Sequence, residues 1–200
     1  MQGERGEEAN RRKGQGRGRY CGPVKTVLWF TTMKEATAKD DYQRLKDELE
    51  AEVSWVGVDK VVVLGIGNTL RGDDGFGPEV ASRVSRLKPD RVFDAGTVPE
   101  DFLGPVVKLR PVLVIIADAA SFGGRPGELR LLRVDQLCGN CLGTHAPSLS
   151  LIEEFLKSEC GARTLVLAAQ PKAMAFGNAL SPQMAAAIQA AADLLISALL

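Results

Sequence analysis

Short runs of consecutive apolar residues alternate along the chain with segments whose apolar residues recur every three or four positions. Apolar runs of this length, bounded by turn residues, are typical of strands buried on both faces. Three runs fit this description: Val61–Gly65, Val112–Ala117 and Thr164–Ala168. Two shorter segments predict further strands, namely Arg91–Asp94 and Leu129–Val134.

Segments with helical spacing separate the predicted strands. Helices are expected over Pro78–Leu87, Glu100–Leu109, Ser148–Lys157 and Gln183–Leu199. Strands that alternate with helices indicate parallel pairing, because the connecting helices pack on both faces of the sheet. The fold class predicted from the pattern is therefore α/β, a three-layer α/β/α sandwich with a mostly parallel, mixed central sheet.

The N-terminal part of the chain has a different pattern. Residues 1–20 are rich in glycine and arginine and have no apolar period, which predicts a disordered basic arm. Residues 21–57 are expected to form an extension with a charged helix over 34–52 and a narrow apolar stripe of Tyr42, Leu45, Leu49 and Val53. The compact domain is expected over residues 58–200.

Composition narrows the possible partners. Lys plus Arg and Asp plus Glu number 25 each, so the net charge is zero and nothing favours nucleic acid as the main partner. The N-terminal apolar run Val27–Phe30 is far too short to span a bilayer, and we expect no membrane partner and a cytoplasmic location. The cysteines do not form the disulfide framework of a small secreted protein: Cys21, Cys138, Cys141 and Cys160.

Polar segments follow the predicted parallel strands, and the carboxyl ends of such strands meet at one edge of the sheet. These segments are Gly65–Gly77, Asp94–Gly96, Asp118–Ala120 and Gln170-Pro171. The only histidine, His145, lies in a loop just before a predicted helix, which brings it toward the same edge. We therefore place the candidate site at this edge.

The glycine-rich loop after the first strand does not fit a dinucleotide. Leu70 stands where the third glycine of that fingerprint belongs, and Asp73 and Asp74 would face the pyrophosphate. A metal fits better, since Asp74, Asp118 and His145 offer two carboxylates and an imidazole, which suit divalent nickel, zinc or iron. Three such ligands would hold a free ion weakly and leave coordination positions open for a group carried by a substrate. The alternative is structural: aspartates after strands often form turns or caps, and a lone histidine is often a surface or core residue.

Several motifs together resemble the hydrogenase maturation proteases. The opening signature is Gly67-Asn68-Thr69-Leu70 followed by Gly72-Asp73-Asp74-Gly75-Phe76-Gly77. The pattern continues in order through Asp94-Ala95-Gly96-Thr97-Val98-Pro99-Glu100, Asp118-Ala119, Pro126-Gly127-Glu128, Thr144-His145 with Pro147 and Leu149, and Gln170-Pro171. The resemblance covers residues 58–200, and the first 57 residues lie outside it.

The resemblance implies an endopeptidase that removes the C-terminal tail of a nickel-loaded NiFe hydrogenase large-subunit precursor. Asp74, where some members carry glutamate, Asp118 and His145 match the residues thought to contact the nickel of that subunit. Nickel would then be supplied by the substrate rather than permanently held. A non-catalytic, nickel-dependent chaperone or docking module of the same fold is an alternative. A peptidase of the spore germination type, which would cut without nickel, is another.

Residues beside these three have structural alternatives. Asp73 is expected to cap the turn, with a direct role as the alternative, and Asn68 to shape the loop by bonds from its side chain to the backbone. Met174, Phe176 and Gly177 are candidates to line a peptide groove, or else belong to the core or a loop.

The pair Cys138 and Cys141 with His145 spells C-x2-C-x3-H, which predicts an accessory zinc site with Cys160 as the fourth ligand. The alternative is free thiols or one local disulfide. If His145 served such a site, its part in the family's site would be in doubt.

Overall fold

The computed structural model describes residues 24–140 and 146–200, with side chains from residue 39 to 137 and from residue 148 onward. The chain divides into two compact units between Ala38 and Lys39. The unit Lys39–Leu200 holds every strand of the described residues, and the candidate site belongs to it.

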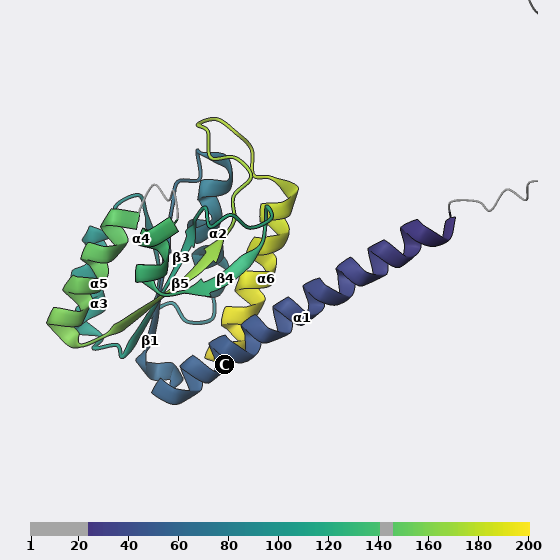
Figure 1. Ribbon diagram of the computed structural model, residues 1–200. Coiled ribbons are helices and arrows are strands. Elements are labelled where there is room, and N and C mark those ends of the chain that lie inside the picture. Colours follow the sequence, from purple (N-terminus) through teal and green to yellow (C-terminus); the bar gives the residue numbers. More distant parts are fainter. Residues whose placement is uncertain (1–23, 141–145) are drawn as a thin grey trace, which may run out of the picture. The chain divides into compact units, whose positions relative to one another are not determined.

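The central sheet has the strand order β2-β1-β3-β5-β4. Its strands are β1 (Val61–Ile66), β2 (Val92–Gly96), β3 (Leu113–Ala119), β4 (Leu129–Leu132) and β5 (Arg163–Ala169). All neighbours run parallel except β4, which pairs antiparallel with β5 at the edge of the sheet. The five predicted strands and the mixed, mostly parallel sheet are confirmed (Figure 1).

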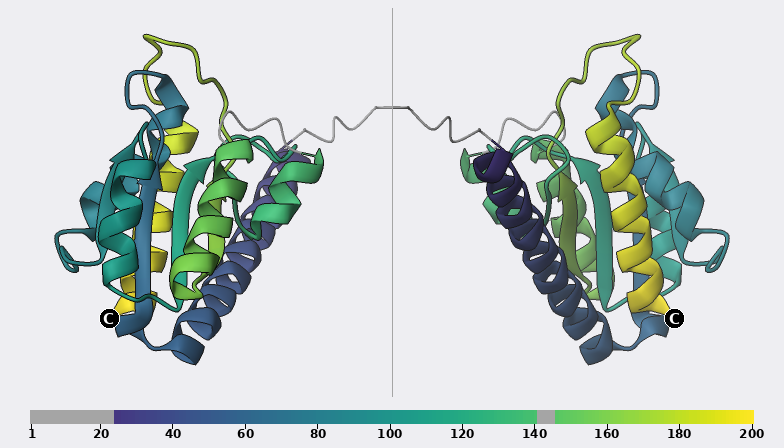
Figure 2. Two further views of the ribbon diagram at one scale, coloured as in Figure 1. Left: turned by 90° about the vertical axis from the view of Figure 1, so that its left-hand side faces the viewer. Right: turned by 90° about the vertical axis from the view of Figure 1, so that its right-hand side faces the viewer.

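Helices cover both faces of this sheet, which confirms the predicted α/β/α sandwich (Figure 2). One face packs against α2 (Phe76–Val84), α6 (Pro182–Leu199) and the end of α1 (Val24–Val56). The other packs against α3 (Glu100–Lys108), α4 (Val134–Asn140) and α5 (Ala146–Cys160). Alternate residues of β1 point to the two cores, since Val61 and Val63 lie in the first and Val62 and Leu64 in the second. Short 3-10 turns precede β1 (η1, Val58–Lys60) and α2 (η2, Gly72–Gly75).

Helix α1 is longer than the predicted 34–52 segment, and its apolar stripe is confirmed. Leu45, Leu49 and Val53 are buried in the first core, with Tyr42 partly buried against it. Because this stripe completes the core, the compact unit begins before Val58, where the sequence placed the start of the domain. Residues 1–20, predicted to be a disordered basic arm, lie outside the described residues.

Helix α4 has no counterpart among the predicted elements. Val134, which the sequence assigned to a strand, begins the helix instead, and it is buried together with Leu137. Val134 and Leu137 are the two buried residues of one helical turn. A single turn is too short for its spacing to be told apart, in the sequence, from the end of an alternating strand. Helix α5 also begins two residues before the predicted Ser148.

Helix α6 is, among the described residues, the one helix long and apolar enough to cross a membrane by length and composition. Its apolar face packs on the sheet, where it buries Met184, Ala187, Ile188, Ala191, Ala192, Leu194, Leu195, Ala198 and Leu199. The apolar residues of α6 are buried against the sheet, so its high hydropathy is that of a core helix.

Candidate functional site

The loop between β1 and α2 carries the opening motif, and its glycines allow it to lie close to the strand ends. A Cβ atom on Gly77 would overlap the carbonyl oxygens of Ile66 and Ala117. The first turn of α2 therefore rests directly on the carboxyl ends of β1 and β3. Gly67 has a positive φ of 143°, and a Cβ there would overlap the carbonyl of Asp74. Only glycine fits at these close approaches.

Asp74 and Asp118 lie at the same edge of the sheet. Asp118 follows Ala117, whose partner across the sheet is Gly65. The carbonyl of Asp74 accepts a hydrogen bond of 3.0 Å from the backbone N–H of Asn68. Turn η2, which contains Asp74, also contacts β3, which contains Asp118. Both aspartates thus lie beside residues 65–68, as the sequence predicted.

The carboxylate of Asp74 is buried without a hydrogen-bond donor among the described residues. The residue is 1% exposed, and neither Oδ1 nor Oδ2 has a hydrogen-bond partner there. Native proteins rarely leave a buried carboxylate in this state, because its desolvation goes uncompensated. A cation brought to the site would supply the missing interaction. Asp118, which is 2% exposed, adds a second buried carboxyl group at this edge.

Asp73 has the opposite environment, although it is the adjacent residue. Its Oδ2 accepts hydrogen bonds from the N–H groups of Lys172 (2.7 Å) and Ala173 (3.4 Å) and from the Ser181 hydroxyl (2.9 Å), while Oδ1 accepts from the Ser181 N–H (2.8 Å). Burial by itself raises the pKa of Asp73, but these hydrogen bonds outweigh it and lower the pKa below its usual value. Asp73 therefore joins η2 to the segment between β5 and α6.

Two further polar residues of the motifs shape turns. The Asn68 Oδ1 accepts from the N–H of Leu70 at 2.9 Å, which confirms its predicted role in the loop. The exposed Asp94 Oδ1 accepts from the N–H of Gly96 at 3.1 Å, where φ is 52°. Both are local turns of the kind that asparagine and aspartate favour.

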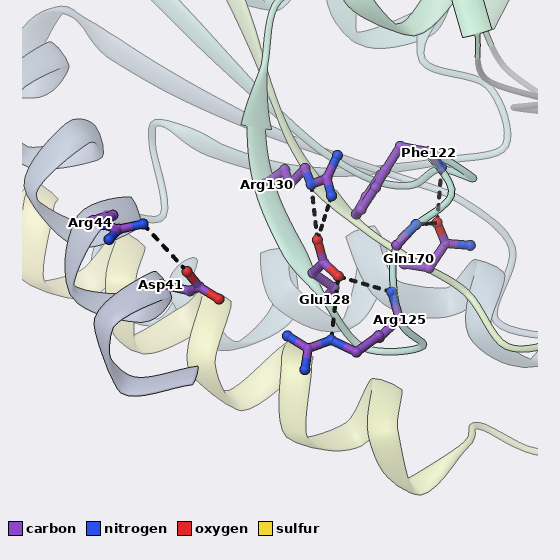
Figure 3. A network of polar contacts seen from close by, with 8 residues as sticks. Asp41, Arg44, Phe122, Arg125, Glu128, Arg130 and Gln170 are labelled. Atoms are coloured by element: carbon purple, nitrogen blue, oxygen red, sulfur yellow. Dashed lines mark hydrogen bonds and ion pairs between the residues drawn. The ribbon is translucent and has the colours of Figure 1, made fainter. Parts of the chain in front are cut away.

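Gln170 and Glu128 hold the connection between β3 and β4 (Figure 3). The Gln170 Oε1 accepts from the N–H groups of Phe122 (2.9 Å) and Gly124 (3.0 Å). Glu128 accepts from the N–H of Arg125 (2.9 Å) and from the Arg130 guanidinium (2.7 Å). Burial raises the pKa of Glu128, and the Arg125 N–H and the Arg130 guanidinium together lower it further than burial raises it. The segment after Asp118 is thereby fixed at both ends.

The structure leaves part of the predicted site untested. His145 and Cys141 lie outside the described residues, and the side chain of Cys138 is not described. The Cys160 thiol is free and donates to the carbonyl of Leu156 at 3.2 Å. No cluster of metal ligands is present among the described side chains. The histidine of the candidate site and the accessory zinc site stay predictions.

Sequence reasoning missed how the segment 170–181 supports the site. Ser181 is the N-cap of α6 and accepts from the N–H of Met184 at 3.1 Å, while its own N–H and hydroxyl hold Asp73. The dipeptide Ser181-Pro182 is a helix-start signal that could have revealed the cap. No signal in the sequence links it to Asp73.

Comparisons with known proteins agree with this architecture. The family model described as "Hydrogenase maturation protease" matches residues 78–198. The hydrogenase 3 maturation protease of Escherichia coli is 32% identical over 118 residues, which are 58% of this chain and 75% of that protein.

Solved structures of the same kind share the fold. The crystal structure of the NiFe hydrogenase maturation protease HycI from Thermococcus kodakarensis is 30% identical, has a TM-score of 0.64 and is aligned over 70% of this chain and 92% of its own. The hydrogenase maturating endopeptidase HybD of E. coli is 27% identical, with a TM-score of 0.60 over 70% of this chain and 91% of its own. With the family model spanning more than half of the sequence, the chain belongs to the hydrogenase maturation proteases, which are peptide hydrolases.

Proposed function

We propose that this chain removes a C-terminal peptide from the precursor of a NiFe hydrogenase large subunit that already carries nickel, and that it does so in the cytoplasm. Membership of the family supports the reaction. The buried carboxylate of Asp74, which has no hydrogen-bond partner among the described residues, lies beside the strand end at Asp118, and this observation supports a metal-directed site.

Nickel enters this proposal as part of the substrate. Asp74 and Asp118 are hard oxygen ligands, and the family pattern adds the imidazole of His145; together they suit a divalent first-row metal. Lacking thiolates, these ligands would hold a free ion weakly and would capture one that the substrate already coordinates. Cleavage would then depend on the metal having been inserted, so an unloaded subunit would be left uncut.

Two versions of the chemistry are consistent with these residues. In the first, the metal polarises the scissile carbonyl or a water molecule, and the aspartates only hold it in place. In the second, Asp74 or Asp118 also takes a proton from the attacking water as a general base. Both require that a peptide reach the edge of the sheet that carries Asp74 and Asp118.

The test is to incubate the purified protein with nickel-loaded and nickel-free precursor and to weigh the products by mass spectrometry. We expect a shortened subunit and a released C-terminal peptide only from the nickel-loaded precursor. Cutting of both forms would contradict the role of nickel. Binding of the precursor without any cutting would make the chain a docking module.

The residues are tested by Asp74→Asn and Asp118→Asn in the same assay. Each variant removes one anionic ligand, and we expect processing to fall by about 10³-fold or more, which corresponds to about 4 kcal/mol of transition-state stabilisation. Asp94→Asn is the control, since Asp94 belongs to the same motif series but is an exposed residue of β2 whose side chain accepts from the N–H of Gly96. Circular dichroism should show that all three variants are folded.

A further inference from the structure

Exposed apolar side chains lie on the two loops that carry and support Asp74. Leu70, in the loop after β1, is 62% exposed, and Phe176, in the loop between β5 and α6, is 76% exposed. Leu180, further along the second loop, is 38% exposed. Figures 1 and 2 show both loops side by side beyond the carboxyl ends of the strands. We call Leu70, Phe176 and Leu180 the apolar rim.

Hydrogen bonds join the two loops between Leu70 and Asp73. The N–H of Gly177 donates to the carbonyl of Leu70 (2.9 Å), and the Arg71 Nε donates to the carbonyl of Met174 (3.3 Å). The N–H of Asp73 donates to the carbonyl of Ala173 (3.1 Å), in addition to the bonds that its carboxylate accepts. The rim is therefore presented by a fixed pair of loops, and Leu70 lies four residues before Asp74.

The fold does not need Phe176 to be exposed. In the same loop Met174 packs against the first core, so the segment can bury an apolar side chain where packing requires one. An aromatic ring left in water forgoes about 1.5–3 kcal/mol of burial energy, and apolar side chains gathered at one surface are typical of protein contacts. Aromatic residues of this kind often dominate the energy of an interface.

The place of the apolar rim next to Asp74 indicates which partner it binds. A stable interface covers roughly 800 Å² on each partner. A protein whose peptide bond reaches Asp74 must therefore also cover the loops around this residue. We propose that the apolar rim binds an apolar surface of the folded large-subunit precursor next to its C-terminal tail. The inference rests on the proposed function, and it assigns affinity for the subunit to Leu70 and Phe176 and cutting to the buried carboxylates.

The test compares Phe176→Gln and Leu70→Gln with Trp55→Gln. Trp55 is a matched control because it is 74% exposed and lies in α1, ahead of the amino end of β1. Among the described aromatic and cation contacts, its ring contacts only the guanidinium of Arg163. For the nickel-loaded precursor we expect KM to rise about 10-fold in each rim variant with kcat little changed, and neither to change in Trp55→Gln. A short peptide that has only the cleaved sequence and nickel cannot contact the rim, so wild type and variants should treat it identically, whether or not they cut it.

Binding of the precursor, measured by calorimetry, separates the two proposals. If wild type binds and cuts the precursor and the rim variants match it in KM and affinity, the rim proposal is wrong and the proposed function stands. If wild type binds without cutting and the rim variants bind about 10-fold more weakly, the rim proposal stands and the proposed function is wrong. If wild type neither binds nor cuts, both are overturned.

Discussion

Two adjacent aspartates of this chain show how the surroundings assign different roles to one residue type. The carboxylate of Asp73 accepts four hydrogen bonds, whereas the carboxylate of Asp74 accepts none from the described residues, and both residues are 1% exposed. A carboxylate surrounded by donors is stable as an anion and has little left to offer a ligand. A carboxylate without donors can accept a cation. Asp73 therefore supports the loop, and Asp74 is available for chemistry.

Asp73→Asn should destabilise the protein by about 2 kcal/mol at pH 7, because hydrogen bonds to a charged group contribute about 1.5–3 kcal/mol and the new NH2 group would face donors. The pKa of Asp73 is lowered on folding, so its stabilisation is present above the pKa of the unfolded chain, about 3.9, and is lost as pH falls through the folded pKa. Urea unfolding of both proteins between pH 7 and pH 3 measures this. The difference between them should shrink at the acid end.

At this scale the sequence predicted that Asp74 and Asp118 lie at one edge of the sheet and that Asp73 serves the turn, but not which groups hold the Asp73 carboxylate. Asp74 lies in the loop after β1, Asp118 lies at the carboxyl end of β3, and parallel strand ends meet, so their proximity could be expected from pattern alone. The donors to Asp73 come from residues up to 108 positions away along the chain. No local pattern encodes so distant a contact.

The helix α2 illustrates the constraints on a single element. Gly77 lies against the backbone carbonyls of Ile66 and Ala117, so its missing side chain sets how closely α2 approaches the sheet. Because Asp74 lies three residues before Gly77, the same approach sets the depth at which the acidic turn enters the site.

Gly77→Ala should destabilise the protein by about 3 kcal/mol, at the upper end for overpacking, since backbone atoms cannot move aside as a flexible side chain can. Gly104→Ala is the matched control. Gly104 is an exposed glycine within α3 with nothing within 4 Å of an added Cβ. It should stabilise the protein by about 0.5–1 kcal/mol, because alanine is the better helix former. Thermal unfolding checks both; equal effects would contradict this packing.

Elements with a strong period were predictable, and those with a weak one were not. Fully apolar strands such as β3 and the alanine-rich α6 stand out from their flanks, because burial on both faces or along a wide stripe demands such runs. Helix α4 spans only seven residues with a single core turn, which is too little for a period to be recognised. The antiparallel direction of β4 depends on its connection, and residue pattern alone does not determine it.

At the scale of the whole molecule, the compact unit begins at Lys39 rather than at Val58. Sequence resemblance begins near residue 58, yet the stripe Leu45, Leu49 and Val53 is buried in the first core. The resemblance could not reveal this, because it concerns the motif-bearing part of the chain and not what covers that part. The stripe itself was predictable from its spacing. The core against which the stripe packs was not.

A chain that begins at Lys39 should keep the stability of the full-length protein to within about 1 kcal/mol. A chain that begins at Val58 should lose roughly 5 kcal/mol or more, because burial of each of three such side chains contributes about 1.5–3 kcal/mol. Typical domains have only 5–15 kcal/mol in total. Urea unfolding of the three chains measures the difference. Equal midpoints for all of them would mean that the helix is dispensable.

The carboxylate of Asp74, buried without a donor from the described part of the chain, sets activity against stability. Asp74→Asn should raise the melting temperature by a few degrees, since the folded protein would no longer bury an anion that these residues leave without a hydrogen bond. Differential scanning calorimetry would detect the change. Directed evolution that selects variants for heat stability alone would then enrich inactive enzymes. Active variants with a higher melting temperature would need stabilising substitutions outside the acidic turn.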